Sequence, residues 1–280
     1  MITGAGGFAG THLAAACAGD HVIALTRDVC DLRDAAATRA ALAAARPDVV
    51  YHLAARAHVG DSWRDPAGTL HDNVALTLHV LEAVRAEAPA AAVLVVSSGE
   101  VYGPSGVLPV DESAPLSPQS PYAVSKAACD LLAGQYADAH ALRVIRARAF
   151  NHAGPGQDST YAISSFARQA AGGATRIVTG NPDTRRDYTD VRDVVRAYRL
   201  LAQHAAPGIY NVCSGRSVST AELVRMLGAE AEVDPDRVRP NEVVDLYGSY
   251  AKLHAATGWE PEIPLELTLR DALEFWTRRA

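Results

Sequence analysis

The sequence lacks the long apolar and basic runs that mark several specialised classes of protein. No apolar run reaches the roughly 20 residues that a membrane-spanning helix needs. Glycines interrupt the apolar residues near the N-terminus, which is unlike a signal peptide. We therefore expect a protein that is neither exported nor membrane-spanning. The net charge is −6 and no long basic run occurs, so we expect no nucleic-acid partner.

Cysteine is scarce, and the cysteines are neither close together nor spaced like metal ligands. They are Cys17, Cys30, Cys129 and Cys213. Dispersed cysteines favour reduced thiols and therefore a cytoplasmic location. His52 and His58 lie near one another, but no carboxylate or cysteine completes a site with them, so we expect no bound metal.

The first ten residues read as a strand, a glycine-rich turn and the start of a helix. Three residues are few for a central parallel strand, so this strand is either clipped or preceded by residues outside this numbering. Gly4, Gly7 and Gly10 fit a loop that turns tightly, lets a pyrophosphate come close and packs on the next helix. Gly6 and Ala9 offer an alternative spacing, and without other support the loop would equally be a flexible turn.

The residue that ends the second strand is expected to determine whether the protein binds NAD or NADP. We expect this strand over residues 21–26, followed by Arg27. An aspartate there would accept a hydrogen bond from the ribose 2′-hydroxyl of NAD, whereas a guanidinium suits the 2′-phosphate of NADP. Asp28 follows directly, so NADP(H) is favoured and NAD(H) stays an alternative.

Strands and helices alternate along the chain, and 49% of its residues are hydrophobic, enough for a full core. The pattern predicts an α/β fold, a Rossmann-type doubly wound parallel sheet with a smaller C-terminal α/β substrate-binding lobe. The expected strands are 48–53, 93–96, 143–148 as the sixth, 176–179, and 208–213 as the seventh; the expected helices are 34–45, 70–86, 161–171, 185–201, one capped at 219, and one from 265. Residues 1–150 and 187–215 are expected to form the NADP(H)-binding domain, and 151–186 and 216–280 the lobe. The segment from residue 217 on is too small for an independent core, so we expect it to pack on the nucleotide domain.

The stretch from Ser97 to Lys126 carries the candidate chemistry. Tyr122 and Lys126 are four apart in a predicted helix, so their side chains share one face. Free tyrosine titrates near ~10, and the neighbouring ammonium is expected to lower that pKa. Ser98, after the strand 93–96, can donate a second hydrogen bond to the same substrate oxygen. A Tyr and a Lys at this spacing are also common on helix surfaces, so other motifs in the sequence have to decide whether this pair is catalytic.

The order of these motifs resembles that of the extended short-chain dehydrogenase/reductases that act on nucleotide sugars. Three stretches carry the resemblance, which spans nearly the whole chain: Thr3–Gly10 (TGAGGFAG), Ser98 with Tyr122 and Lys126, and Arg186–Tyr188 (RDY). In that family an Asp-hydrophobic pair touches adenine, and small residues after the third strand let the cofactor lie close. The implied cofactor-binding residues are Gly4, Gly7, Phe8, Ala9, Gly10, Arg27, Asp31, Leu32, Leu53, Ala54, Ala55, Tyr122 and Lys126.

The resemblance also implies a nucleotide-sugar site at the carboxyl edge of the sheet. Arg186 and Arg239 are assigned to the pyrophosphate and Glu242 to the nucleotide ribose, with a purely structural role of Arg186 in its own lobe as the alternative. The full set of implied substrate-binding residues is Ser62, Ser98, Glu100, Tyr122, Asn151, Arg186, Arg239 and Glu242. A GDP-linked sugar is favoured on resemblance alone. Members of the family dimerise through helices matching 70–86 and 122–139, whose apolar stripes would also suit an ordinary core.

Among these enzymes the chain is most similar to the GDP-4-keto-6-deoxy-D-mannose reductases, through FNHAGPGQ at 150–157 and YNVCSG at 210–215. The GDP-mannose 4,6-dehydratases are similar through 239–243. A dehydratase must also move the C5 proton, and Glu100 is the one carboxylate beside Ser98 that remains for this task. A reductase needs only Ser98, Tyr122, Lys126 and a reduced cofactor. We therefore expect an NADPH-dependent 4-keto reductase, with a 4,6-dehydratase or a 4-epimerase as alternatives. A redox-sensing binding module would need neither Tyr122 nor Lys126.

Overall fold

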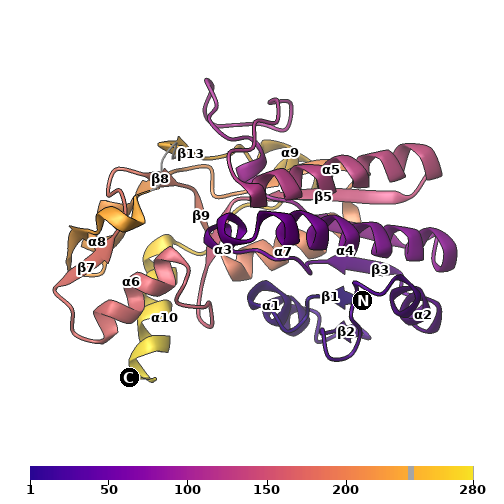
Figure 1. Cartoon of the computed structure of the whole chain (residues 1–280), viewed down its shortest axis with the longest axis horizontal. Coiled ribbons are helices and arrows are strands. Elements are labelled where there is room, and N and C mark those ends of the chain that lie inside the picture. Colours follow the sequence, from indigo (N-terminus) through magenta and orange to yellow (C-terminus); the bar gives the residue numbers. More distant parts are fainter. Residues whose placement is uncertain (239–242, 280) are drawn as a thin grey trace.

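A six-stranded parallel sheet runs through the larger part of the molecule (Figure 1). The computed structural model describes residues 1–238 and 243–279. The strands are β1 (Ile2–Thr3), β2 (Ala24–Leu25), β3 (Val49–His52), β4 (Ala92–Val96), β5 (Arg143–Ala149) and β10 (Gly208–Val212). Their order is β10-β5-β4-β3-β1-β2, so the chain winds outward in both directions from the β1–β3 pair. This order confirms the doubly wound Rossmann-type fold, but the described sheet has six strands rather than seven.

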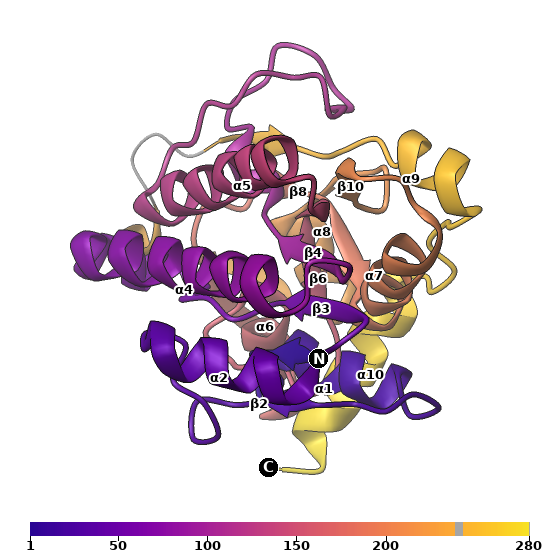
Figure 2. The same cartoon turned by 90° about the vertical axis from the view of Figure 1, so that its right-hand side faces the viewer.

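Helices cover both faces of this sheet (Figure 2). One face carries α2 (Ala35–Ala45), α4 (Pro66–Glu87) and α5 (Pro121–His140), and the other carries α1 (Phe8–Ala16), α7 (Val191–His204) and α9 (Ala251–Thr257). β4 is apolar at every position because a strand covered on both faces has no side to expose. Val93 and Val95 pack with α2, α4 and α5, whereas Leu94 packs with α1 and α7.

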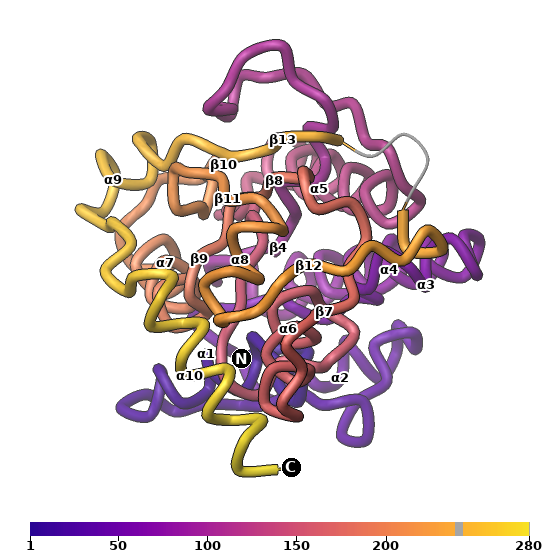
Figure 3. The backbone as a smooth tube through the Cα atoms, turned by 90° about the vertical axis from the view of Figure 1, so that its left-hand side faces the viewer, coloured from indigo at the N-terminus to yellow at the C-terminus, as the bar shows by residue number. Residues whose placement is uncertain are grey.

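The smaller lobe lies beside the carboxyl edge of the sheet and is built from short elements (Figure 3). Its described strands form three small sheets: β7 (Arg176–Thr179) with β12 (Glu230–Val233), β6 (Asn151–Ala153) with β9 (Tyr188–Asp190), and β8 (Arg185–Arg186) between β11 (Val218–Ser219) and β13 (Asp245–Leu246). Its helices are α6 (Ala162–Ala171), α8 (Thr220–Met226) and α10 (Leu265–Thr277). All three helices contribute to a separate apolar cluster. This cluster combines residues 153–177 with residues 223–272, so the segment from residue 217 on shares its core with the segment before it.

The strand expected over 21–26 is shorter in the structure, where β2 spans only Ala24–Leu25. Two predicted helix starts also differ from the structure, and capping side chains explain both. The helix expected from residue 185 begins at Val191, because Asp190 caps it by accepting a hydrogen bond from the Arg192 amide at 2.9 Å. The preceding residues form β8 and β9 instead. The helix expected over 70–86 begins earlier, at Pro66, where Asp65 caps it by accepting from the Gly68 amide at 3.0 Å. The remaining short elements are α3 (Val59–Arg64), η1 (Gly99–Val101) and η2 (Pro235–Arg237).

The segment between η1 and α5 has no helix or strand and projects from the body of the molecule (Figure 1). Val110 anchors it: its amide donates to the Tyr247 carbonyl at 2.9 Å, and its carbonyl accepts from the Ser249 amide at 2.8 Å. The Glu112 carboxylate adds a bond from the Asn211 amide at 2.7 Å. Within the described part of the chain, no helix combines the length and apolar character needed to cross a bilayer.

Candidate active site

Ser98 and Tyr122 meet where β4 and α5 approach each other. Ser98 follows β4 and caps η1, accepting from the Glu100 amide at 3.2 Å. Tyr122 lies in the first turn of α5, which Ser120 caps by accepting from the Ala123 amide at 3.1 Å. The Ser98 hydroxyl lies close enough to the Tyr122 phenol to lower its pKa. The structure thus brings together the two groups that the sequence assigned to one substrate oxygen.

The electrostatics of Tyr122 differ from the sequence-based expectation. Burial raises the pKa of the phenol above its usual value, outweighing the hydrogen bond from Ser98 that lowers it, and the Glu100 charge raises it further. Lys126, only 6% exposed, is itself disfavoured as an ammonium, since burial lowers its pKa against the opposing effects of Cys129 and Asp130. The phenol therefore stays protonated at neutral pH in this structure, which suits a proton donor.

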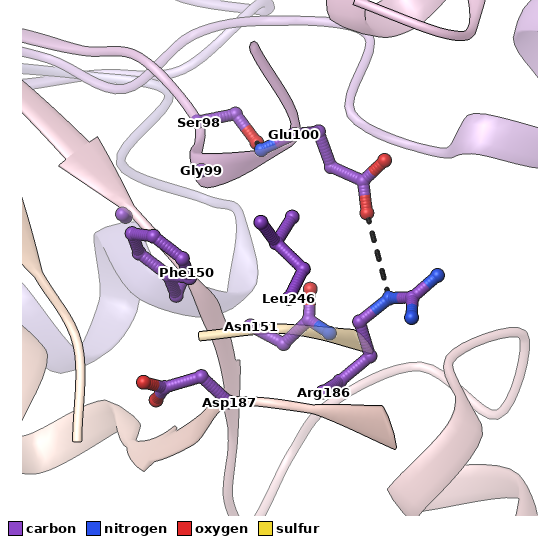
Figure 4. A pocket seen from close by; sticks show the side chains of 9 residues that line it. Ser98, Gly99, Glu100, Phe150, Asn151, Arg186, Asp187 and Leu246 are labelled. Atoms are coloured by element: carbon purple, nitrogen blue, oxygen red, sulfur yellow. Dashed lines mark hydrogen bonds and ion pairs between the residues drawn. The ribbon is translucent and has the colours of Figure 1, made fainter. Parts of the chain in front are cut away.

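A narrow pocket opens beside these groups (Figure 4). Its lining residues are Ser98, Gly99, Glu100, Ala149, Phe150, Asn151, Arg186, Asp187 and Leu246. Glu100 and Arg186 point toward one another across it, with 4.0 Å between Oε1 and Nε. Arg186 Nη1 also donates to the carbonyl of Val243 at 2.6 Å. Arg186 therefore holds its own lobe together and also lines the pocket, while its assignment to the pyrophosphate stays a prediction.

Asp187, which lines the pocket, joins its own segment to two others, at residues 214–215 and at residue 248. Its carboxylate accepts hydrogen bonds from the backbone amides of Ser214, Gly215 and Gly248 at 2.7, 3.0 and 3.4 Å. Burial nevertheless raises the pKa of this carboxyl to about 6, because the amide hydrogen bonds only partly offset its loss of water. Sequence reasoning found Asp187 only as a member of the Arg-Asp-Tyr motif and gave it no task.

The glycine-rich loop has the geometry of a dinucleotide cradle. Gly4 has φ +68°, and a Cβ there would stand 2.8 Å from the Ala54 amide nitrogen. A Cβ on Gly10 would stand 2.2 Å from the Gly4 carbonyl oxygen, so neither position tolerates a side chain. Gly7 caps α1 and donates to the Gly4 carbonyl at 3.0 Å. A Cβ on Gly6 would meet only the end of a side chain at 3.4 Å, so the steric demands fit the Gly4, Gly7, Gly10 spacing.

Residues predicted for the adenosine half of the cofactor lie near this loop. Arg27 is exposed after β2, and Leu32 is buried. Asp31 pairs with Arg33, whose Nε donates to Oδ1 at 3.0 Å, and these bonds hold the pKa of Asp31 at about 2. Sequence reasoning missed Arg33, because nothing in the spacing of the two residues indicates that pair. Leu53, Ala54 and Ala55 follow β3 and are partly exposed, and the Phe8 ring stacks on His152 at 6.0 Å between centroids.

Ser62 and Tyr122, both predicted to bind substrate, are not among the lining residues of this pocket. Ser62 is fully buried, and its hydroxyl donates to the Val59 carbonyl at 2.7 Å, away from the pocket lining. Arg239 and Glu242 lie outside the described residues. No group of three His, Cys, Asp or Glu side chains suited to a metal occurs within residues 1–238 and 243–279.

Comparison with known proteins gives likenesses over nearly the whole chain. A family model described as GDP-mannose 4,6 dehydratase matches residues 20–272. GDP-6-deoxy-D-mannose reductase of Pseudomonas aeruginosa is 40% identical over 295 residues, covering 100% of this chain and 97% of that protein. The structure of RMD from P. aeruginosa complexed with NADPH has a TM-score of 0.90 at 39% identity, covering 100% and 99% of the two chains. UDP-glucose 4-epimerase of Thermus thermophilus, in complex with NAD, gives 0.88 at 27% identity, covering 98% and 97%.

Proposed function

We propose that this chain, which belongs to the extended short-chain dehydrogenase/reductases acting on nucleotide sugars, reduces the 4-keto group of a nucleotide-linked 4-keto-6-deoxy sugar with NADPH. The observation that carries the proposal is the 40% identity to a GDP-6-deoxy-D-mannose reductase over the whole chain. We therefore take GDP-4-keto-6-deoxy-D-mannose as the substrate. A protonated Tyr122 supports the same direction of reaction, because reduction of a ketone consumes a proton.

The described side chains supply each step that falls to the protein. When bound, NADPH supplies the hydride that the sugar's C4 receives. Tyr122 gives its phenolic proton to the carbonyl oxygen, which becomes the new hydroxyl, and Ser98 donates a second hydrogen bond to that oxygen. We assign to Lys126 the stabilisation of the phenolate formed at Tyr122; because burial lowers its pKa, this role requires that Lys126 keep its proton during the transfer. Ser98 and Tyr122 already lie near one another, as the effect of Ser98 on the pKa of the phenol indicates, and this proximity supports their assignment to one substrate oxygen.

For the cofactor, the preference for NADP(H) rests on two guanidiniums. Arg33 is hydrogen-bonded to Asp31, and the charge of Arg27 adds a smaller effect to the lowered pKa of that carboxyl. We assign the 2′-phosphate to this pair and the pyrophosphate to the loop from Gly4 to Gly10 at the start of α1. NAD(H) remains the alternative, because Asp28 and Asp31 are both near enough in sequence to serve a ribose hydroxyl.

For the substrate, we assign the sugar to Ser98, Glu100, Tyr122 and Asn151. Arg186 is assigned to the diphosphate together with Arg239, and Glu242 to the ribose. The pocket holds only about 10 Å³ of free space, so Arg186 has to leave Glu100 when the ligand enters. An unchanged KM for a GDP-sugar in both Arg186→Ala and Arg239→Ala would remove the diphosphate assignment.

A 4,6-dehydratase is the second candidate, since Glu100 lines the pocket and the matching family model bears that name. The two activities give opposite outcomes in one pair of assays. We expect NADPH to be consumed when the keto sugar is supplied with stoichiometric cofactor, and GDP-mannose with catalytic cofactor to stay unchanged. A 4-keto product from GDP-mannose would install the dehydratase instead. A 4-epimerase, the third candidate, would convert a GDP-hexose to its C4 epimer without net consumption of cofactor.

We further propose a homodimer formed through α4 and α5. Leu131 and Val124, seven residues apart on α5, are 61% and 41% exposed, which is unusual for apolar residues on a long helix. All four cysteines are buried and free, and we propose a cytoplasmic location on the basis of these reduced thiols.

A further inference from the structure

A continuous chain of buried hydrogen bonds joins the dinucleotide loop to the catalytic helix. It begins at Thr3, directly before Gly4, and passes through His52 at the end of β3 to Thr77 on α4. There it reaches Asn73, whose side-chain amide donates to Ser125 at 2.8 Å. Every member is at most 3% exposed.

The far end of the chain reaches Tyr122 itself. Ser125 Oγ donates to the backbone carbonyl of Tyr122 at 2.7 Å. At the near end, Thr3 Oγ1 accepts a hydrogen bond from the backbone amide of Ala54. This is the amide nitrogen that a Cβ on Gly4 would approach most closely. The chain therefore starts at the wall of the cofactor cradle and ends at the backbone of the proton donor.

The donors and acceptors along the chain fix the tautomer of His52. Thr77 Oγ1 gives its proton to the Asn73 carbonyl at 2.9 Å, so it must accept from His52 Nε2, which lies 3.2 Å away. Nδ1 then carries no proton and accepts from Thr3 Oγ1 at 2.9 Å. Burial, followed by the nearby charge of Lys126, lowers the pKa of His52 to about 3, which keeps the ring neutral. A protonated ring would lose its acceptor and break the link to Thr3.

We propose that His52 is a positioning residue that couples the dinucleotide loop to Tyr122, so that cofactor binding and proton donation depend on one another. The imidazole joins the sheet to α4 by accepting a hydrogen bond on one side of the ring and donating one on the other. For the task of Tyr122 the inference rests on the proposed function, but the coupling itself does not.

The decisive experiment is a double-mutant cycle on the two ends of the chain. Thr3→Val and Ser125→Ala each remove one hydroxyl. NADPH affinity and kcat/KM are measured for the wild type, both single variants and the double variant, and again in a His52→Gln background. Gln can place its terminal amide near the position of Nε2 and donate to Thr77, but it has no atom at the position of Nδ1 to accept from Thr3. We expect the two effects to depart from additivity by threefold or more in the wild-type background, and to become additive within about twofold in the Gln background.

A matched control comes from the same helix. Thr69 on α4 is as buried as Thr77 and makes the same kind of bond, donating to the Asp65 carbonyl at 2.8 Å, but it lies outside the chain. Thr69→Val should be additive with Ser125→Ala in both backgrounds. Additivity of Thr3→Val and Ser125→Ala in the wild type would overturn the proposal, even when all variants melt at lower temperature.

A second measurement is independent of activity and of any variant. Nitrogen-15 NMR of histidine-labelled protein should show His52 as the Nε2–H tautomer, with no titration between pH 5 and 8. A proton on Nδ1, or a titration in that range, would refute the chain as described. A failure of the reductase assay would leave this readout and the NADPH affinities intact, so the two failures are distinguishable.

Discussion

The carboxylate of Asp130 accepts two hydrogen bonds from the guanidinium of Arg148, at 3.0 and 3.1 Å. Asp130 lies on α5, one helical turn beyond Lys126. Asp130 and Arg148 are both buried, at 0% and 3% exposure. Arg148 continues to the Tyr102 hydroxyl at 3.0 Å, which in turn donates to Asn211 Oδ1 at 2.7 Å. The pair thus ties α5 to β5 and β10.

We expect Asp130→Asn to destabilise the protein by about 3–5 kcal/mol, because Arg148 would be left as a buried charge without its partner. Urea unfolding measures this loss. Asp138→Asn, on the exposed side of the same helix, is the control and should change the unfolding free energy by less than about 0.5 kcal/mol. Equal effects of the two substitutions would show that the pair contributes nothing of its own.

Tyr122→Phe should lower kcat by roughly 10²–10⁴-fold with the keto sugar, since the proton donor is lost. NADPH affinity should change little. Glu100→Gln should cost less than about tenfold, because reduction needs no second carboxylate. Tyr136→Phe, which removes a phenol on the same helix that bonds Glu82, serves as the matched control and should retain the rate. A larger loss in Glu100→Gln than in Tyr122→Phe would favour the dehydratase.

Arg27→Ala should reduce the preference for NADPH over NADH by on the order of ten- to a hundredfold, because a charge-assisted contact to the 2′-phosphate is removed. Arg33→Ala should act in the same direction. Fluorescence titration of both cofactors provides the measurement. Arg39, an exposed arginine on α2 paired with Glu87, gives the control variant Arg39→Ala. Equal affinity of the unmutated protein for the two cofactors would end this assignment.

The raised pKa of Asp187 predicts a particular dependence of stability on pH. The folded protein holds this proton more tightly than the unfolded chain, so the contribution of Asp187 to stability is fully present below ~4 and is lost as the pH rises through about 6. The free energy of unfolding of the wild type relative to Asp187→Asn should therefore increase by on the order of 2–3 kcal/mol between pH 7.5 and pH 4. A difference that stays constant over this range would contradict the burial argument.

Leu131→Asp should convert the dimer to a monomer, because it places a charge in the proposed contact between two copies of α5. Sedimentation or light scattering reports the mass. Val233→Asp, at a 48% exposed apolar position on β12 in the other lobe, should leave the mass unchanged. A wild type that is already monomeric at micromolar concentration would rule out the dimer.

Much of the fold was predictable because parallel strands and glycine loops leave local signals. The strand 176–179 and the capping box at Ser219 match the structure. The helix start at residue 185 was misjudged because Asp190 caps the helix only once β8 and β9 have found partners elsewhere in the chain. For the site, the pairing of Ser98 with Tyr122 followed from motif order. The hydrogen-bond chain through His52 links it to one residue 49 positions away in sequence and to another 25 positions away. No local sequence pattern indicates such contacts.

The position of β10 in the sheet has a consequence for how the protein is made. β10 pairs with β5, yet the whole of β6 to α7 is synthesised between them. A nascent chain that has reached Ala149 therefore carries an open parallel edge on β5 until Gly208–Val212 emerges. Open edges invite pairing with other chains. β5 carries Arg143, Arg146 and Arg148. Charged side chains on an edge strand discourage such pairing, which protects β5 until β10 is synthesised.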